Sequence, residues 1–546
     1  MTASATPARV SVSLVLALCS GLHSGQPRAQ PNAFQPEVTV TLDMSAPLAG
    51  SGLRTGNSAA QAVAMPQVAP RVNLFGLEPG PPAVSPRDSR REFRLAQFQL
   101  PQAGSREGSG PARQQVEELA KELDYQYSWG SDTELIVERN NDLRSDRRDE
   151  LRLLNPTLFF LGRTGVLPWV DVNLGATFEQ QLRLHEEEIT VLPDNTREPS
   201  LRRSFTAKLD VANIVIKNIP DHPLEITLGR RTFEDPRLWL YDVTLDGVHV
   251  RYRGESYSTE VSVTREDQWD MSVFLDFPKS TIKNYILYHD YRGIEDHRIA
   301  AYAIARLDRL PQSEGRFKLY GVRAYGRPSD KFNYWSELGW VRGIDESRVP
   351  QPLNGVAYDV GATYRFPQAF WSPCLTVGNA YGSGDDRNDG VNREYRQTGF
   401  QSNETKFCGV AQFKRYGEFI DPELSNLRIY TLGIGFRPTA NIYVDVVHHQ
   451  YKLNHIATDV RNGLISAQMN TRLAGANRRS LDVGREIDLI VAFRRLFDTK
   501  WGVDLRAGYF IPGNAYLRND GANNPASARR FADPDKGLRV LAVISY

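Results

Sequence analysis

Residues 170–184 read VDVNLGATFEQQLRL, and their side chains alternate between apolar and polar over almost the whole stretch. One face carries Val170, Val172, Leu174, Ala176, Phe178, Leu182 and Leu184, and the other carries Asp171, Asn173, Thr177, Glu179, Gln181 and Arg183. Strict alternation predicts a β-strand with one apolar and one polar face. The run is longer than most strands of globular proteins, but it suits a tilted membrane strand, which needs about 9–11 residues in the bilayer plus its extensions.

The same period of two continues from Asp124 to the end of the chain. It recurs in residues 224–231, 248–253, 356–366, 486–493 and 503–509. The polar face of these segments carries charges of both signs and many glycines, which is typical of a water-filled lumen. Alternation by itself would also fit a soluble β-sandwich with one buried face.

Three further features favour a membrane barrel. Aromatic residues gather near the expected strand ends, as interfacial girdles do; examples are Tyr285, Tyr288 and Tyr291, and Trp335 and Trp340. Short turns such as residues 437–441 alternate with long polar loops such as residues 382–403. The last strand places Leu538, Val540, Ala542, Ile544 and Tyr546 on one face. We therefore predict an all-β, transmembrane antiparallel β-barrel, in which about 420 residues give roughly 16–18 strands and an aqueous channel.

The first part of the chain has a different composition. Residues 1–29 are predicted to be a signal peptide, because Arg9 precedes an apolar run over residues 10–18. Residues 30–110 are rich in Pro, Gly, Ala, Ser and Gln, so we expect a disordered extension. Residues 111–123 show helical spacing and predict a short helix or tether, and residues 124–546 are assigned to the barrel. No other stretch approaches the roughly eighteen apolar residues of a membrane-spanning helix, so a membrane protein with this sequence must be a barrel.

Charge and cysteine content limit the remaining function classes. The 66 Lys and Arg residues nearly balance the 65 Asp and Glu residues, so any basic groove must be local, and no nucleic-acid partner is predicted. Cys374 and Cys408 remain after removal of the signal peptide, and they form either one disulfide or two unpaired thiols. The spacing of Cys and His indicates no metal site, and no cofactor is predicted.

Five segments carry a more specific signal. They are LGRRTFEDPRLWLYD (228–242), GSGDDRNDGVNREYRQTGFQSN (382–403), YGEFIDPELSNLRIYTLG (416–433), VGREIDLIV (483–491) and RAGYFIPGNAY (506–516). In this order they resemble the alginate export porin family, over most of the chain after Asp124. The resemblance implies an 18-stranded outer-membrane barrel with a narrow, arginine-rich constriction that selects an anionic uronic-acid polymer. It also implies a monomer that docks onto a periplasmic secretion scaffold.

The chain departs from the family pattern at two places. Asp504 stands where the pattern carries another inward arginine. The long periplasmic plug of the family is replaced by a short turn at residues 495–501. The acidic extracellular loop that caps the pore in the family corresponds here to Glu186, Glu187 and Glu188.

The polar phase of the strands supplies candidate pore-lining residues. A polyuronate carries one carboxylate per sugar, and guanidinium groups replace the water around such charges well, because they stay charged and offer paired N–H donors. The predicted lumen cations are Lys208, Arg231, Arg251, Arg365 and Arg506, of which the last two match inward arginines of the family. Interspersed carboxylates would keep each site shallow, as multi-site conduction requires; they are Asp210, Glu225, Asp445, Glu486 and Asp488. For each of these residues the alternative is a solvated wall charge paired with a neighbouring strand.

The predicted function is passive export of an anionic polysaccharide, with alginate or a related polyuronate as the first candidate. A porin that prefers small anionic solutes and export of another acidic exopolysaccharide are the alternatives. No enzyme is predicted: an outer-membrane hydrolase would need a Ser, His and carboxylate constellation facing lipid near a rim, and the sequence does not indicate that Ser258 or Ser262 pairs with His249. A purely structural or adhesive barrel would not need inward arginines.

Overall fold

The computed structural model describes most of the chain after residue 124. The described residues are 125–143, 150–167, 169–186, 203–217, 219, 222–266, 282–308, 315–346, 350–387, 389–470, 479–516 and 534–546, all within the compact unit Pro79–Tyr546. The predicted signal peptide, extension and helix (residues 1–29, 30–110 and 111–123) lie outside the described residues. Glu187 and Glu188 do as well, and of Glu186 only the backbone is described.

The described chain is built almost entirely of β-strands. The wall strands are β1 (Tyr125–Arg139), β2 (Glu150–Leu167), β3 (Val170–Glu186), β4 (Arg203–Ile216), β5 (Leu224–Glu234), β6 (Asp242–Arg253), β7 (Tyr257–Arg265), β8 (Lys283–Tyr291), β9 (His297–Leu307), β10 (Arg316–Ser329), β11 (Phe332–Asp345), β12 (Gln351–Arg365), β13 (Cys374–Gly382), β16 (Leu427–Thr439), β17 (Ile442–Leu453), β18 (Asp482–Phe493), β19 (Gly502–Pro512) and β20 (Gly537–Ser545). Two short strands, β14 (Glu404–Thr405) and β15 (Phe413–Lys414), pair only with each other, and a 3-10 turn, η1, covers Leu496–Asp498.

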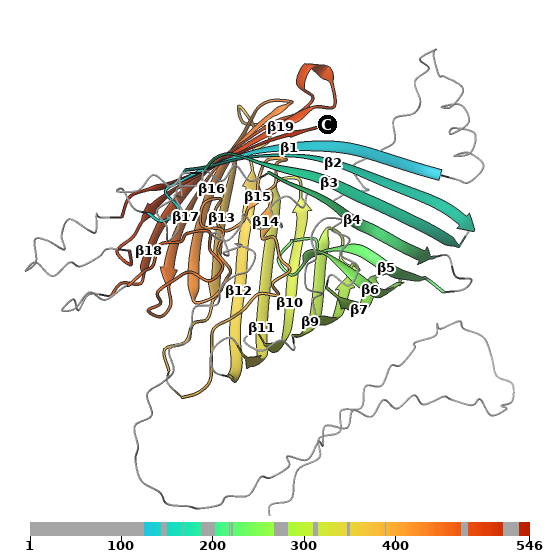
Figure 1. The fold of residues 1–546 in the computed structure, drawn as a ribbon, viewed down its shortest axis with the longest axis horizontal. Coiled ribbons are helices and arrows are strands. Elements are labelled where there is room, and N and C mark those ends of the chain that lie inside the picture. The colour runs from blue at the N-terminus through green and yellow to red at the C-terminus, as the bar shows by residue number, and fades with distance from the viewer. Residues whose placement is uncertain are drawn as a thin grey trace, which may run out of the picture. The chain divides into compact units, whose positions relative to one another are not determined.

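The wall strands form one closed antiparallel sheet (Figure 1). Each strand pairs with the next along the chain, and β13 pairs directly with β16. The first strand, β1, pairs with β2 and also with the last strand, β20, where Asp132 lies opposite Ser545 and Arg139 opposite Leu538. The 18-stranded sheet therefore has no free edge. The prediction of an all-β antiparallel barrel with about 18 strands is confirmed.

The two ends of the barrel differ in the length of their connections. At the end where β1 begins and β20 ends, the connections are short, as at residues 330–331 and 440–441. At the opposite end they are long, as at residues 383–426 and 454–481. We call these the turn end and the loop end. Because outer-membrane barrels keep short turns in the periplasm and long loops at the cell surface, the loop end faces outward from the cell.

Side chains alternate between the outer face and the lumen as the sequence pattern predicts. In β3, Leu174 is 60% exposed on the outer face, whereas Asp171 is buried toward the lumen. At the turn end the outer face carries the exposed rings of Trp129, Trp501 and Tyr546. The centroid of the Tyr546 ring lies 5.5 Å from that of Trp129 and 5.1 Å from that of Trp501. An apolar belt with an aromatic rim is the surface that a bilayer requires. No helix among the described residues is both long and apolar enough to cross a membrane.

Two of the predicted girdle aromatics instead face the lumen. Tyr285 and Tyr291 are exposed on the outer face, but Tyr288 is buried. In β11, Trp340 is exposed, but Trp335 stacks on Phe407 inside the barrel. The physical reason is the strand period of two: residues three or five positions apart lie on opposite faces. Because the prediction relied on clustering along the sequence, it assigned two aromatic residues too many to the girdle, Tyr288 and Trp335.

The outer face can be tested at Leu174. Leu174→Arg should lower the free energy of unfolding by about 2–4 kcal/mol if this position lies near the bilayer midplane, because the charge is placed in hydrocarbon. Leu174→Phe, which keeps an apolar group at the same position, should change it by less than about 1 kcal/mol. Guanidinium unfolding in lipid vesicles measures both. Equal stability of the two variants would show that this face does not contact lipid.

Candidate functional site

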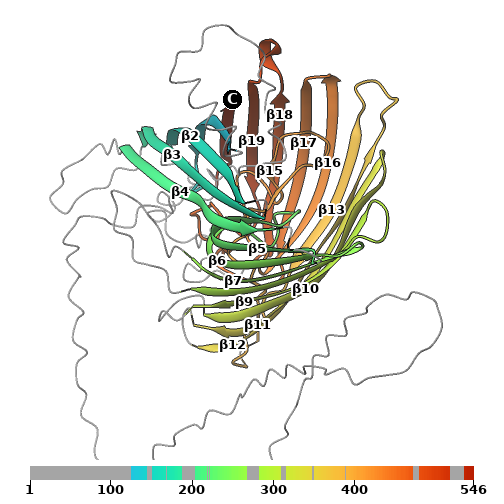
Figure 2. The same cartoon turned by 90° about the vertical axis from the view of Figure 1, so that its right-hand side faces the viewer.

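The connection between β13 and β16, residues 383–426, folds into the barrel, and we call it the lumen loop. Five of its aromatic side chains are each at most 1% exposed: Tyr395, Phe400, Phe413, Tyr416 and Phe419. Several of these rings share one buried cluster with wall residues such as Phe317 and Phe510. Figure 2 shows β15, which belongs to this loop, within the curve of the sheet. The loop thus occupies part of the lumen, which the sequence analysis predicted to be filled with water.

A disulfide holds the lumen loop at the far end of the barrel. Cys408 of the loop bonds to Cys374, the first residue of β13. Because the loop leaves β13 at Gly382, at the loop end, and Cys374 lies at the turn end, the loop reaches through the depth of the wall. The carboxylate of Asp445 accepts backbone hydrogen bonds from Cys408 and Gly409. Of the two possibilities for the cysteines, the structure has the disulfide, so these sulfurs offer no thiolate to a metal.

A second segment that folds inward is the β5–β6 connection at residues 235–241. Buried arginines link it to the barrel wall. Arg237 of this segment pairs with Glu337 at 2.9 Å and with Asp359 at 2.8 Å. Arg323 of β10 pairs with Asp235 and with Glu337, the latter at 2.9 Å. These side chains are at most 6% exposed. Because each charge has an opposite partner, the buried network is compensated.

The electrostatics of this network keep the Asp235 carboxylate charged. Burial alone would raise the pKa of Asp235, but the Arg323 guanidinium and backbone N–H groups of Leu240 and Arg237 bind the carboxylate and hold its pKa below the usual value. The segment is joined to the lumen loop by Trp239, whose Nε1–H donates to the Tyr416 hydroxyl at 2.8 Å. The two inward segments therefore form one packed unit with the wall.

Five of the ten predicted pore residues lie against the lumen loop, and we call them the covered charges: Arg365, Asp445, Glu486, Asp488 and Arg506. Glu486 accepts hydrogen bonds from the backbone N–H of Phe419 at 2.5 Å and of Ile420 at 3.2 Å. Arg506 lies 3.5 Å from Glu418 of the loop. Both side chains face the lumen, and the loop contacts them there.

The other three covered charges have similar surroundings. Arg365 donates to the Phe407 carbonyl at 3.3 Å. Asp488 is fully buried, 3.4 Å from His449 Nε2. Apart from Arg365, which is partly exposed, the covered charges are at most 5% exposed. Arg365 and Asp445 thus contact the loop directly, and Asp488 is buried beside His449 of the wall.

The other five predicted residues lie on β4, β5 and β6, and we call them the wall charges: Lys208, Asp210, Glu225, Arg231 and Arg251. Lys208 pairs with Glu179 at 2.8 Å, and Arg251 pairs with Glu260 at 2.7 Å and Glu225 at 3.8 Å. Lys208, Glu225 and Arg251 keep about a quarter of their side-chain surface exposed.

The remaining two wall charges also contact their own part of the wall. Asp210 accepts from the Thr177 hydroxyl of β3, and the Arg231 guanidinium lies 5.0 Å from the centroid of the Phe233 ring. The wall charges thus include both signs on β4 and on β5, and all five are partly exposed.

The buried arginine network was missed by sequence reasoning. Arg323, Glu337 and Asp359 do lie on the polar phase of their strands, and they are direct neighbours in register. Their position on the polar face of each strand was therefore a signal that these three side chains point into the lumen. Their partners Asp235 and Arg237 belong to a connection, and no sequence period shows where a connection folds.

A contact between His249 and Ser262, which sequence analysis did not indicate, does form. Ser262 Oγ lies 2.9 Å from His249 Nδ1, and Glu260 Oε2 lies 3.9 Å from His249 Nε2. The reason is register, since His249 and Ser262 are opposite residues of β6 and β7. Both side chains are buried on the lumen side, not on the lipid-facing rim that a membrane-facing hydrolase would use.

Comparison with known proteins adds a family. A family model described as alginate export matches residues 135–531. The chain is 24% identical over 314 residues to the alginate production protein AlgE of Pseudomonas aeruginosa, which covers 51% of this chain and 62% of that protein. It is 29% identical over 173 residues to the alginate production protein AlgE of Azotobacter vinelandii, which covers 29% of this chain and 32% of that protein. The chain thus matches less than two thirds of the length of these curated relatives.

Solved structures with a similar fold come from Pseudomonas aeruginosa. OccK9 (OpdG) is 13% identical, with a TM-score of 0.48, and covers 78% of this chain and 98% of that chain. The outer membrane protein OpdK is 10% identical, with a TM-score of 0.47 and the same coverage.

The buried network can be tested at Arg323. Arg323→Leu should lower the free energy of unfolding by about 3–5 kcal/mol, because Asp235 loses its buried arginine and Glu337 keeps only Arg237. The control is Arg327→Met on the same strand: Arg327 is half-exposed and lies 3.5 Å from the exposed Asp330, so its loss should change the value by less than about 1 kcal/mol. Guanidinium unfolding in vesicles compares the two. A similar small change in both would mean that the inward segment does not depend on this network.

Proposed function

The chain belongs to the alginate export family, and from this premise we propose that it is a passive outer-membrane porin through which an anionic polysaccharide, alginate or a related polyuronate, leaves the cell. The observation that carries the proposal is the arrangement of the wall charges. Lys208 and Arg251 are accessible cations, and each is already paired with a carboxylate of a neighbouring strand. The names of the curated relatives support a uronic-acid polymer as the substrate.

The paired cations suit movement better than tight binding. A passing uronate carboxylate would exchange with Glu179 at Lys208, or with Glu260 at Arg251, so that one charge-assisted contact replaces another of similar strength. Such an exchange costs little and leaves no deep well, which is the condition for conduction through several sites. Such partly exposed pairs also break more easily than buried ones. The β4–β6 wall is therefore our candidate track for the polymer.

The lumen loop sets the width beside this track. It lies against β12 and β17–β19 through the covered charges, and the disulfide and Asp445 fix its deepest part. We propose that the loop acts as the constriction of the pore and keeps the polymer near the wall charges. In this role the covered charges position the loop and do not contact the substrate. Docking onto a periplasmic secretion scaffold stays a prediction.

The track can be tested by single-channel recording with added mannuronate oligomers. Wild-type protein should show transient block, and Lys208→Gln with Arg251→Gln should weaken the apparent affinity for the oligomer by roughly 25-fold, from about fivefold for each lost charge contact. Lys331→Gln with Lys500→Gln removes the same charge from exposed turns and should leave block unchanged. Ordinary anion current without block in the wild type would instead indicate a porin for small solutes.

The constriction can be tested at the disulfide. Cys408→Ser should raise the mean conductance and its fluctuations, because the deepest part of the lumen loop loses its covalent attachment. Reduction with dithiothreitol should produce the same change in the wild type and none in the variant, and Cys374→Ser should behave as Cys408→Ser does. Identical conductance in the oxidised wild type and both variants would show that this part of the loop does not limit the pore.

A further inference from the structure

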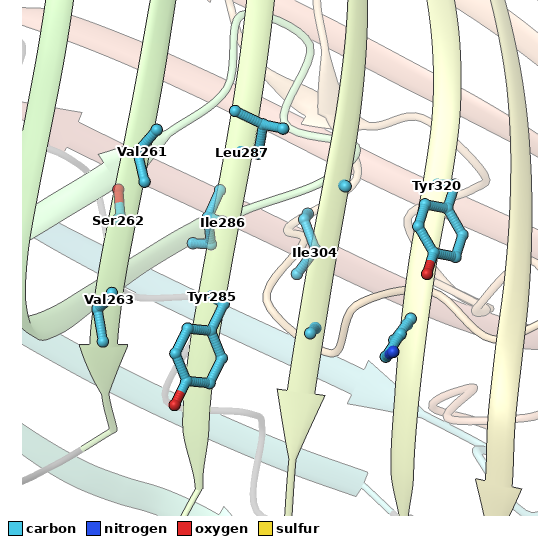
Figure 3. Close-up of a pocket in the computed structure, with 11 residues that line it drawn as sticks. Val261, Ser262, Val263, Tyr285, Ile286, Leu287, Ile304 and Tyr320 are labelled. Carbon is cyan, nitrogen blue, oxygen red and sulfur yellow. The ribbon is translucent and has the colours of Figure 1, made fainter. Parts of the chain in front are cut away.

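A shallow apolar trough crosses the outer face of the barrel on β8, β9 and β10 (Figure 3). Its floor is made by the small outward side chains of β9, Ala303 and Ala305. One side is formed by Tyr285 and Leu287 of β8, and the other by Tyr320 of β10. These larger side chains are 41–45% exposed. Because alanine lies between rows of large residues, the surface is hollowed along β9.

Basic side chains flank the trough where it approaches the loop end. On β9, Ala305 lies between Tyr285 and Lys318, and Leu307 lies between Lys283 and Arg316. One strand further, Arg342 lies opposite Lys318. All four cations, Lys283, Arg316, Lys318 and Arg342, are exposed.

The cations are only partly neutralised. Arg316 pairs with Glu346 at 3.1 Å. Lys283, Lys318 and Arg342 add positive charge beside it, so the described side chains of this patch carry a net positive charge. Charged side chains on a lipid-facing surface are unfavourable near the bilayer midplane, but they are tolerated near the interface, where long side chains extend to the headgroups. The patch therefore lies at the depth where anionic headgroups are found.

We propose that the trough and these cations form a binding site for a phosphorylated, multiply acylated lipid of the outer leaflet, of the lipid A type. An acyl chain would lie along the alanine floor between Tyr285 and Tyr320, and a phosphate would contact Lys318 and Arg342. Basic patches at the membrane interface bind phosphorylated headgroups in this way. The position at the loop end selects the leaflet that faces the outside of the cell.

A comparison within the barrel separates this site from a general basic rim. Lys452 and Arg485 are also exposed on the outer face near the loop end, on β17 and β18. The outward residues that follow them toward the membrane are large, such as Val446, Ile487 and Leu489. The β17–β18 rim thus offers charges without an alanine floor, and it provides the matched control.

The test is a titration of the purified full-length barrel in detergent with bisphosphorylated, hexa-acylated lipid A, followed by native mass spectrometry. The wild type should bind one tightly held lipid. Lys318→Gln with Arg342→Gln should weaken binding by about 25-fold, roughly fivefold for each basic residue. Ala303→Leu with Ala305→Leu fills the trough without changing charge and should also weaken binding. Lys452→Gln with Arg485→Gln should bind as the wild type does.

Further arms separate the two halves of the ligand. Dephosphorylated lipid A should bind the wild type as weakly as the bisphosphorylated lipid binds the Lys318→Gln, Arg342→Gln variant. Circular dichroism of every variant checks that the barrel is intact. The proposal is overturned if the two charge variants lose binding equally, because the rim would then act as a whole. It is also overturned if the filled trough binds normally, or if the wild type holds no lipid A.

Discussion

The closed sheet is the constraint on which every other feature of this protein depends. Inside a bilayer no water pairs with an exposed backbone N–H or carbonyl group, so a membrane sheet must satisfy all of them internally. Here β20 returns to β1 and completes the ring. Closure then gives each strand one lipid-facing and one lumen-facing side, and all charges that cannot face lipid must lie inside. The two-residue period of the sequence is the direct consequence.

The side chains of the wall do not fill the lumen, because a barrel of this size encloses more space than they occupy. The protein fills part of it with the lumen loop and the 235–241 segment. The inward segments carry arginines such as Arg237 into a region with little water, so carboxylates on β11 and β12, Glu337 and Asp359, must compensate them. The barrel interior therefore divides into a packed side, held by compensated charges, and the β4–β6 side, where charges retain contact with water.

The sequence predicted the wall far better than the interior. Alternation placed Asp171 inside and Leu174 outside, because the direction of a side chain in a strand is a local property. The same phase placed Glu486 and Arg506 toward the lumen, as the structure has them. It could not show that Phe419 and Glu418 would cover them, since that depends on where a connection of more than forty residues folds. Tyr288 and Trp335 show the opposite error, in which proximity along the chain was given more weight than the phase of the strand.

The disulfide at Cys408 makes the lumen loop part of the closed wall. The bond of Cys408 to Cys374 closes a covalent ring that contains all of β13 and the first half of the lumen loop. The contacts of that loop lie on strands both before and after it in the chain: Asp242 of β6 and Arg306 of β9 before it, and Glu486 of β18 and Arg506 of β19 after it. The β1–β20 seam is held from inside by this loop: Arg539 of β20 donates to the Glu418 carbonyl at 3.0 Å, and it also lies 3.0 Å from the Glu138 carboxylate of β1.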